Sequence, residues 1–339
     1  MTPTIRDVAK RAGVGVGTVS RVLNRNALVS EATRRRVTRA IAELNYTPNP
    51  VARGLSRGRT NTIAVIVPFF TRPAIIERLR GVQNKLAESD YDLIVYNVET
   101  PERRDQYIRQ VPYFGRVDGV LLISLPPRRT DVKYLAKTKV PIVLVDAHHP
   151  LLNKLNGLVV DDVKGGEQMT QFLIELGHSR IGFVGDFPTN LFNFTSSNDR
   201  LQGYRNALRK AHIPYRSSYV GQGEPGRAHA REIANQMLQL PKPPTAIFAA
   251  SDTQAMGVLE AARDRGLSVP HDLSVAGYDD IEVAEYLGLT TIRQSLYESG
   301  KRGVELLLNA IGDPTMKPSC DVMPTELIVR QTTAAPRAN

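Results

Sequence analysis

The sequence predicts an α/β fold in which a small all-α head precedes a larger core of two lobes, each built on a parallel sheet. Three observations indicate this. The 339 residues are enough for two or three domains. In residues 1–47, apolar side chains recur at helical spacing. Beyond Asn61, short apolar runs alternate with helical patterns, which is typical of βαβ units.

Positive charge is concentrated in the head. Residues 1–61 hold twelve Lys and Arg against three acidic residues, a net charge of +9, whereas the whole chain carries +10. A basic segment joined to a nearly neutral body is typical of a module that meets a polyanion, most often nucleic acid. A merely solubilising charged face is a poorer explanation of so large an excess.

Cysteine usage and hydropathy indicate the compartment. The chain has one cysteine, Cys320, so it forms no internal disulfide framework and suits a reducing compartment. The N-terminal residues contain no apolar signal segment, and no apolar run approaches the length of a membrane span. We therefore expect a cytoplasmic protein, associated with the nucleoid and without a membrane partner.

Three helices are predicted in the head. Thr4 is placed to cap the first helix with Asp7 three positions later, and Gly13 ends it. The second helix is expected from Val16 to Asn24, and the third begins at Ser30. Helical spacing predicts that the three helices bury Ile5, Val8, Ala9 and Ala12; Val19, Val22 and Leu23; and Val37, Ala40, Ile41 and Leu44.

The connection between the first two helices indicates a helix-turn-helix. Only Gly13, Val14 and Gly15 separate them, which is the tight turn of that motif. The second helix is then the natural reader of a DNA major groove. Its predicted outward face consists of Val16, Gly17, Ser20, Arg21 and Asn24.

The stretch TIRDVAKRAGVGVGTVSRVLN resembles the N-terminal signature of the LacI/GalR family of bacterial transcription repressors. The similarity continues through residues 29–68 and, more loosely, to about Arg330. It implies that Val16, Gly17 and Arg21 take the positions that select operator bases. Because an arginine bonds guanine bidentately, Arg21 is the strongest candidate for direct readout.

This chain departs from the family at two positions of the reading helix. Gly15 stands where a capping Ser is usual, and Gly17 has no side chain to contact a base. Thr18 and Ser20 are expected to bond phosphates. The full set of predicted DNA-contacting residues is Thr4, Val16, Gly17, Thr18, Ser20, Arg21, Asn24, Asn49, Ala52 and Leu55.

Residues 49–58 have two interpretations. Gly54 to Gly58 fits G-x-S-x-G, the pattern of a hydrolase nucleophile elbow, but an elbow needs a strand before it and a helix after it. Here a helical pattern precedes the motif and a strand follows. A one-turn helix capped by Asn49 is unstable alone, because nucleation outweighs so few hydrogen bonds.

The resemblance assigns these residues to a hinge helix. It implies that the helix pairs with its twin in the minor groove of DNA, where Leu55 wedges into the central base step. The alternative is that Leu55 packs against the core. The predicted boundaries are 1–47 for the helix-turn-helix domain, 48–61 for the hinge helix and linker, 62–330 for the core and 331–339 for a tail.

Eight apolar runs are predicted strands of the core: 62–67, 92–96, 119–123, 142–145, 158–160, 181–184, 246–249 and 273–276. The core resembles the periplasmic-binding-protein type I fold, in which a ligand cleft separates two lobes. We expect one lobe from residues 62–160 plus 293–322, and the other from 161–290 plus 323–330.

Polar residues that follow these strands are candidates for binding a ligand, because open α/β sheets bind ligands beyond the carboxyl ends of their strands. Asp146, Asp161, Asp162, Asp252 and Asp279 lie there, and each is suited either to accept a sugar hydroxyl or to cap a helix. The resemblance places Arg200 and Asp279 where the family holds its effector. Further candidates are Asp146, Ser251 and Gln294, whereas Asp161 and Asp252 are expected to cap helices.

The exit of the first strand departs from the family. Many sugar-binding members have Asn-Pro-Phe-Phe there, but this chain has Arg72-Pro73-Ala74-Ile75 and so lacks the aromatic ring that would stack on a hexose. If Arg72 faces the cleft, it favours an anionic effector such as a sugar phosphate or sugar acid. Phe69 and Phe70 are expected to belong to the core.

No catalytic, metal or cofactor site is predicted, because the phosphate-loop, zinc and dinucleotide motifs are absent and the histidines are scattered. We expect a transcription regulator, a repressor, that binds a palindromic DNA operator as a homodimer and responds to a sugar, sugar phosphate or sugar acid. The alternatives are a cytoplasmic sugar-binding or sugar-modifying protein with a non-specific nucleic-acid-binding head, and a solute-binding protein for transport. Induction and corepression both remain open, as do dimer and tetramer.

Overall fold

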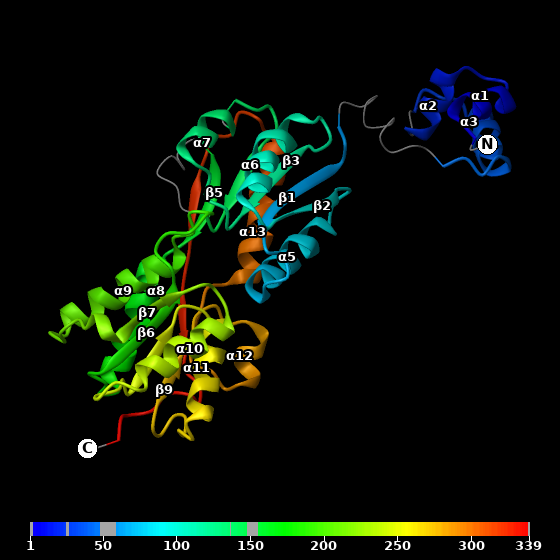
Figure 1. Ribbon diagram of the computed structural model, residues 1–339. Coiled ribbons are helices and arrows are strands. Elements are labelled where there is room, and N and C mark those ends of the chain that lie inside the picture. The colour runs from blue at the N-terminus through cyan, green and yellow to red at the C-terminus, as the bar shows by residue number, and fades with distance from the viewer. Residues whose placement is uncertain (1–2, 25–26, 48–58, 136, 148–154, 338–339) are drawn as a thin grey trace. The chain divides into compact units, whose positions relative to one another are not determined.

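The computed structural model describes residues 3–24, 27–47, 59–135, 137–147 and 155–337. The chain divides into two compact units, Met1–Thr60 and Asn61–Asn339. They are the head and the core, and Figure 1 labels many of the helices and strands of both. Among the described residues, no helix is long and apolar enough to cross a membrane.

The head consists of three helices around a small core. They are α1 (Ile5–Ala12), α2 (Val16–Leu23) and α3 (Glu31–Glu43), which confirms the three predicted helices to within a residue or two. Gly13 ends α1 in the left-handed conformation, with φ of 65°, which glycine adopts without strain. Val8, Val19 and Val37 are fully buried where the helices meet, so one valine from each helix forms the centre.

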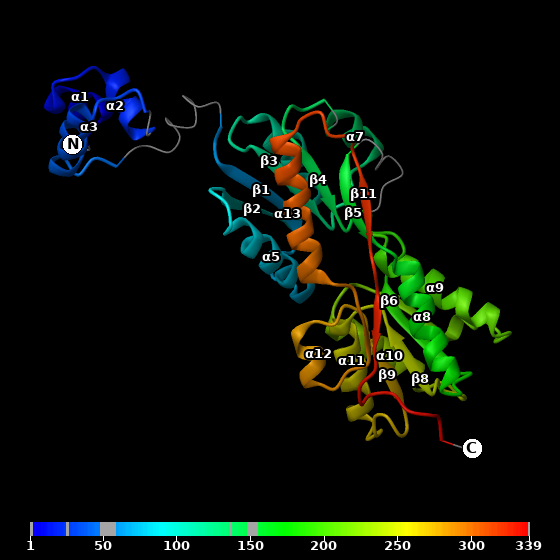
Figure 2. The same cartoon turned by 180° about the vertical axis from the view of Figure 1, so that it is seen from behind.

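The first lobe of the core is a parallel sheet in the order β11-β5-β4-β3-β1-β2. Helices α5 (Pro73–Leu86) and α13 (Leu296–Gly312) cover one face, and α6 (Pro101–Gln110), the short helix Val111–Tyr113 and α7 (Arg129–Leu135) cover the other (Figure 2). The strands are β1 (Thr62–Pro68), β2 (Asp92–Val98), β3 (Gly119–Ile123), β4 (Ile142–Val145), β5 (Asn156–Val160) and β11 (Cys320–Met323).

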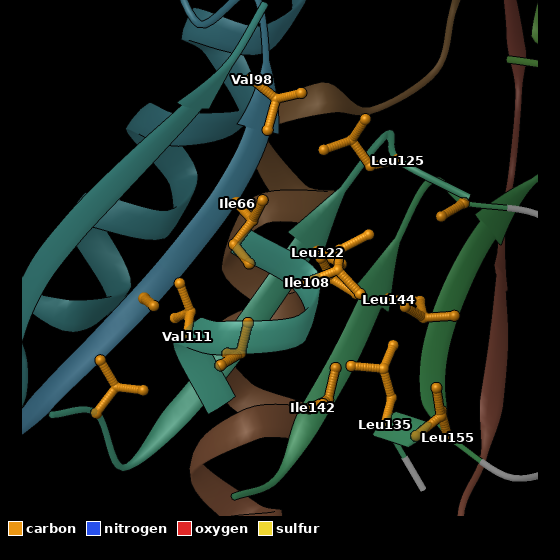
Figure 3. Packing of buried hydrophobic residues seen from close by; sticks show 14 of the residues in the cluster. Ile66, Val98, Ile108, Val111, Leu122, Leu125, Leu135, Ile142, Leu144 and Leu155 are labelled. Atoms are coloured by element: carbon orange, nitrogen blue, oxygen red, sulfur yellow. The ribbon is translucent and has the colours of Figure 1, made fainter. Parts of the chain in front are cut away.

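Alternation along the central strands builds two hydrophobic clusters. Ile66 and Leu122 point to the cluster under α6 and α7, which Figure 3 shows, while their neighbours Val65 and Leu121 point to the cluster under α5 and α13. Because successive side chains of a strand face opposite sides, a strand buried on both faces is apolar throughout. This is why the predicted runs 62–67, 119–123 and 142–145 are strands.

The second lobe is a parallel sheet in the order β7-β6-β8-β9, beside an antiparallel pair of β10 and β12. Its strands are β6 (Ile181–Asp186), β7 (Val220–Gly223), β8 (Ala246–Ala249), β9 (Ser274–Ala276), β10 (Thr291–Arg293) and β12 (Glu326–Ile328). Its helices are α8 (Asp162–Glu175), α9 (Ser196–Lys210), the short helix Ser217–Tyr219, α10 (Arg227–Met237), α11 (Asp252–Asp264) and α12 (Glu282–Tyr286). Helices α8 and α9 pack on one face and α10 and α11 on the other.

The chain passes between the lobes three times: from β5 to α8, from β10 to α13 and from β11 to β12. Figure 2 shows the last of these as the red segment that runs from one lobe to the other. The eight predicted strands are all present, whereas β7, β10, β11 and β12 were not predicted. Residues 331–334, assigned by the sequence to a tail, bind the second lobe, where Val275 N–H donates to the Thr332 carbonyl at 2.8 Å.

Candidate functional site

One face of α2 is exposed in the described part of the head. Val16 is 41% exposed, and Gly17 and Arg21 are also exposed, whereas Val19 and Val22 on the opposite side are buried. Thr18 and Ser20 are half-buried. Helical periodicity therefore separates a core face from a face that carries one arginine and two hydroxyl groups.

Asn24 departs from the outward face that its spacing predicts. It is half-buried, and its side-chain oxygen is buried without a hydrogen-bond partner among the described residues. The helix ends at Asn24, where ψ is 11°, so helical spacing no longer predicts the direction of the Asn24 side chain. Of the other predicted DNA-contacting residues, Asn49, Ala52 and Leu55 lie outside the described part of the chain.

Thr4 and Asp7 form the start of α1. The Asp7 carboxylate accepts from the Thr4 backbone N–H at 2.8 Å and from the Thr4 hydroxyl at 2.7 Å, which lowers the pKa of Asp7. The predicted pairing of the two residues is therefore present. Thr4 itself is exposed.

Several head arginines have no partner among the described residues. Arg21, Arg35 and Arg36 are exposed and make no ion pair or hydrogen bond within the described residues. By contrast, Arg11 and Arg39 share the carboxylate of Glu43 at 2.7 and 3.0 Å. Unpaired surface cations are what a phosphate backbone attracts.

The six residues predicted to bind an effector come together in the core. Arg72, Asp146, Arg200, Ser251, Asp279 and Gln294 all line one cavity of about 330 Å³ that draws its walls from both lobes. Small-molecule sites in proteins typically measure roughly 300–1,000 Å³. The cavity lies beyond the carboxyl ends of β1, β3, β4 and β6, as expected for parallel sheets.

Arg78, which sequence reasoning missed, organises the first-lobe side. It is 1% exposed, and its guanidinium donates to Ser124, Asp146 and Ser299 at 2.8 Å each. Gly300 permits this closeness of α5 and α13, because a Cβ there would lie 2.0 Å from the Arg78 carbonyl oxygen. The arginine compensates the charge of Asp146 and fixes its carboxylate at the cavity.

Arg200 organises the second-lobe side. Its guanidinium donates to Asp162 at 2.8 Å, lies 3.6 Å from a carboxylate oxygen of Asp279, and stacks 3.6 Å from the ring centre of Tyr278. Burial raises the pKa of Asp162 and of Asp279 to about 6, although the Arg200 cation works against this shift. Burial works to lower the pKa of Arg200, but the two carboxylates raise it. Removing a charged group from water is costly, so each member of this cluster depends on the others.

Gln294 joins the two sides. Its amide nitrogen donates to Asp279, and its amide oxygen lies 3.4 Å from the Arg78 guanidinium. Gln294 follows β10, at the point where the chain crosses into the first lobe. A continuous polar chain therefore runs from Arg78 through Gln294 and Asp279 to Arg200.

The acids at strand ends divide between capping and other roles. Asp161 caps α8 as predicted, since its side chain accepts from the Lys164 N–H at 2.9 Å. The prediction that Asp252 caps a helix is wrong: Ser251 caps α11, and Asp252 is fully buried, accepting from the Thr291 hydroxyl at 2.6 Å. Ser251 both caps the helix and lines the cavity.

Arg72 faces the cavity without an ion-pair partner in the described structure. Its guanidinium carbon lies 4.2 Å from the ring centre of Phe69, and burial lowers the pKa of Arg72 while Asp186 and Glu224 oppose that shift. Asp186, another lining residue that was not predicted, accepts from the Gln254 amide at 2.9 Å. Burial raises the pKa of Asp186, against the effect of Arg200 and Arg72.

The cavity has an aromatic wall that the sequence did not predict. Phe194, in the loop between β6 and α9, lines it. The aromatic ring that residues 72–75 after β1 do not provide is therefore present on the second-lobe side of the cavity. Phe69 packs on the first-lobe cluster as expected, whereas Phe70 is 44% exposed. The signal for Phe194 was only a phenylalanine in a loop, which spacing cannot interpret.

Backbone strain is concentrated at the same place. Phe69, Ser124 and Asp146 directly follow β1, β3 and β4 with φ of 43°, 49° and 53°, and Asp279 has φ of 120°. Non-glycine residues adopt such values at a cost of about 1–3 kcal/mol each, and they cluster at functional sites. Of these residues, Ser124, Asp146 and Asp279 line the cavity, whereas Phe69 packs on the first-lobe cluster beside it.

Known proteins are similar to this chain in both units. Residues 4–49 match the family described as bacterial regulatory proteins, lacI family, and residues 170–333 match the periplasmic binding protein-like domain. The ribose operon repressor of Escherichia coli (strain K12) is 34% identical over 317 residues, which covers 93% of this chain and 94% of that protein.

Solved structures extend the similarity to the arrangement of the fold. The lac repressor dimer bound to operator and the anti-inducer ONPF has a TM-score of 0.85 and 28% identity, covering 99% of this chain and 100% of that one. The complex of the transcriptional regulator CelR with cellobiose has a TM-score of 0.72 and 33% identity, covering 97% of this chain and 99% of that one.

Proposed function

This chain belongs to the lacI family of bacterial regulatory proteins, and from that premise we propose that it represses transcription as a homodimer on a palindromic operator. It is a DNA-binding transcription regulator controlled by a small molecule, and it is not an enzyme. Its place of action is then the cytoplasm, where bacterial DNA lies. The predicted domain boundaries, with the hinge at 48–61, form part of this proposal.

The head reads the operator through α2. Val16 and Arg21 face outward and contact base edges, with Arg21 on guanine, while Thr18 and Ser20 bond phosphates. Gly17 supplies close approach rather than a side-chain contact. Thr4 at the start of α1 and the hinge residues Asn49, Ala52 and Leu55 complete the set, and the half-buried Asn24 is its weakest member.

The core binds a sugar or sugar derivative. The observation that carries this proposal is that Arg72, Asp146, Arg200, Ser251, Asp279 and Gln294 converge on one cavity of about 330 Å³. Asp146 and Asp279 are paired with arginines but keep acceptor capacity for hydroxyl groups. A polyol that bonds acceptors of both lobes holds the lobes in one arrangement, and this couples effector to operator by typically about 1–3 kcal/mol. The cellobiose complex of CelR and the ribose operon repressor support this ligand class.

The charge of Arg72 bears on whether the effector is neutral or anionic. As a half-buried cation without an ion-pair partner in the described residues, it favours a sugar phosphate or sugar acid. Phe194 and the acidic lining favour a neutral sugar instead. Arg72→Ala weakens binding of an anionic effector, whereas unchanged affinity in that variant contradicts an anionic one.

The test is a thermal-shift screen of the purified chain against neutral monosaccharides and disaccharides, sugar phosphates and sugar acids. We expect at least one class to raise the melting temperature of the parent protein, and Asp279→Asn to abolish that rise. Asp313→Asn, on an exposed residue remote from the cavity lining, serves as the matched control. If every ligand shifts the parent and Asp279→Asn alike, this cavity is not the effector site.

A further inference from the structure

The loop after β6 connects the two lobes through its side chains. It runs from Phe187 to Thr195, between β6 and α9 of the second lobe. Phe192 of this loop is only 6% exposed and belongs to the hydrophobic cluster of the first lobe, together with Ile66 and Leu122. Figure 3 shows the aliphatic residues of that cluster, with Ile66 and Leu122 among those labelled. A ring from one lobe is thus buried in the core of the other.

A row of rings leads from this anchor to the cavity. The ring centres of Phe69 and Phe192 are 5.5 Å apart in an edge-to-face arrangement, and those of Phe192 and Phe194 are 5.4 Å apart and stacked. Phe194 lines the cavity, and Arg72 lies over Phe69 at the other end of the row. Such ring pairs stabilise a contact beyond the effect of the apolar area that they bury.

Asn190 fixes the backbone that carries the two rings. Its side-chain oxygen accepts from the backbone N–H groups of Phe192 at 3.1 Å and Phe194 at 2.8 Å, and its amide donates to the Phe194 carbonyl at 2.9 Å. The position of Phe194 therefore follows that of Phe192. Leu191, between Asn190 and Phe192, is 72% exposed and takes no part in this packing.

We propose that the loop 187–195 is a clasp between the lobes and that Phe192 is a positioning residue for the effector cavity. Phe192 anchors the loop in the first lobe and thereby holds Phe194 as the aromatic wall. That wall packs against the apolar C–H face of a sugar ring while the carboxylates bind its hydroxyl groups. The description of the wall's ligand rests on the proposed function, whereas the clasp itself does not.

The clasp is tested by hydrogen exchange of the full-length protein without DNA or sugar. In Phe192→Ala, we expect the amides of segments 66–72 and 187–197 to exchange about tenfold faster or more, because the lobes lose the buried anchor. Amides of β8, inside the second lobe, are expected to keep their protection. Unchanged exchange in both segments, or an equal rise in β8, overturns the proposal.

Two variants separate the anchor from its surroundings. Leu191→Ala, in the same loop but exposed, is expected to exchange like the parent protein. Phe192→Leu keeps most of the apolar volume and is expected to recover most of the protection in both segments. If Leu191→Ala loosens the two segments as much as Phe192→Ala does, the anchor is not specific and the proposal fails.

Operator affinity then tests whether the clasp bears on regulation. We expect Phe192→Ala to change the affinity of the sugar-free protein for its operator by severalfold, and Leu191→Ala to leave that affinity unchanged. Equal operator affinity in the two variants overturns the regulatory part. Because exchange is measured without DNA or sugar, failure of the proposed function leaves the exchange result standing and is distinguishable from failure of the clasp.

Discussion

Arg78 is the residue that most affects the first-lobe side of the cavity. Four side chains accept from its guanidinium, and it is 1% exposed, so its loss leaves the carboxylate of Asp146 without a compensating charge. We expect Arg78→Met to lower the free energy of unfolding by about 3–5 kcal/mol.

Urea denaturation measures this loss. Arg80→Met, on the same helix, removes an exposed arginine that pairs only with Glu77 in the described residues. It is expected to cost far less than Arg78→Met, because exposed ion pairs contribute little to stability. Equal losses of unfolding free energy in the two variants would show that the buried network stabilises the fold no more than an exposed ion pair does.

Asp279 makes stability depend on pH. Burial raises its pKa from the ordinary value of 3.8 to about 6, so between these values the folded chain binds more protons than the unfolded chain. Stability therefore falls as pH rises through this window, by up to about 3 kcal/mol. Denaturation midpoints from pH 4 to pH 7 check this, and the slope is expected to flatten in Asp279→Asn. A midpoint that rises over that range in the parent, with no difference in the variant, contradicts the assignment.

Arg21 is the residue on which base readout most depends. It is exposed on α2 and has no internal partner among the described residues, so Arg21→Ala is expected to weaken operator binding by about 1–3 kcal/mol and to relax one operator position. Arg36→Ala removes an equivalent exposed charge from α3 and is expected to leave the base preference intact. Binding measured on single-base operator variants distinguishes the two.

At the scale of elements, the sequence best predicted strands that are buried on both faces and helices whose apolar residues recur periodically. The head helices follow from apolar spacing, and β1, β3 and β4 from uninterrupted apolar runs. The strands that were missed lack that signal: β11 alternates exposed and half-buried residues, and β7 is half-buried until Gly223. Such edge strands are set by pairing with a neighbour, which no local pattern reports.

The cavity residues that follow strands could be predicted from the sequence. Those whose position depends on tertiary packing could not. Asp146 and Asp279 follow apolar runs of the two lobes, and both line the cavity beyond the strands. Arg78 lies inside α5, where an arginine is typical of a solvated face, and only the close approach of α13 buries it. Phe192 and Phe194 are in a loop, whose course depends on the hydrogen bonds of Asn190.

The hinge is the element whose role depends most on a partner. The proposed hinge helix falls on residues outside the described part of the chain. A helix of one turn is expected to order only when something packs on it, and the proposed partner is its twin in the minor groove. Leu55→Ala is expected to reduce both operator affinity and DNA bending, measured by gel mobility of circularly permuted operator fragments. Ser56→Ala, at the serine of the G-x-S-x-G motif, is the control. Intact affinity and bending in Leu55→Ala would contradict the wedge.

At the scale of the whole molecule, both lobes of the core line one cavity and are linked across it. The chain crosses between the lobes three times, and Gln294 at one crossing links Arg78 to Asp279. The loop 187–195 adds a fourth, side-chain connection. The proposed effector would contact both lobes at once, and we expect its affinity to differ between arrangements of the lobes, which is what an effector requires.

The central claim is that a sugar-type effector controls sequence-specific DNA binding. The most direct measurement is selection of bound duplexes from a random pool by the purified full-length protein at physiological salt, with and without a mixture of sugars, sugar phosphates and sugar acids. The account predicts enrichment of a palindrome with a flexible pyrimidine–purine step at its centre, and a change in enrichment when the mixture is added. The absence of an enriched palindrome under both conditions would contradict it.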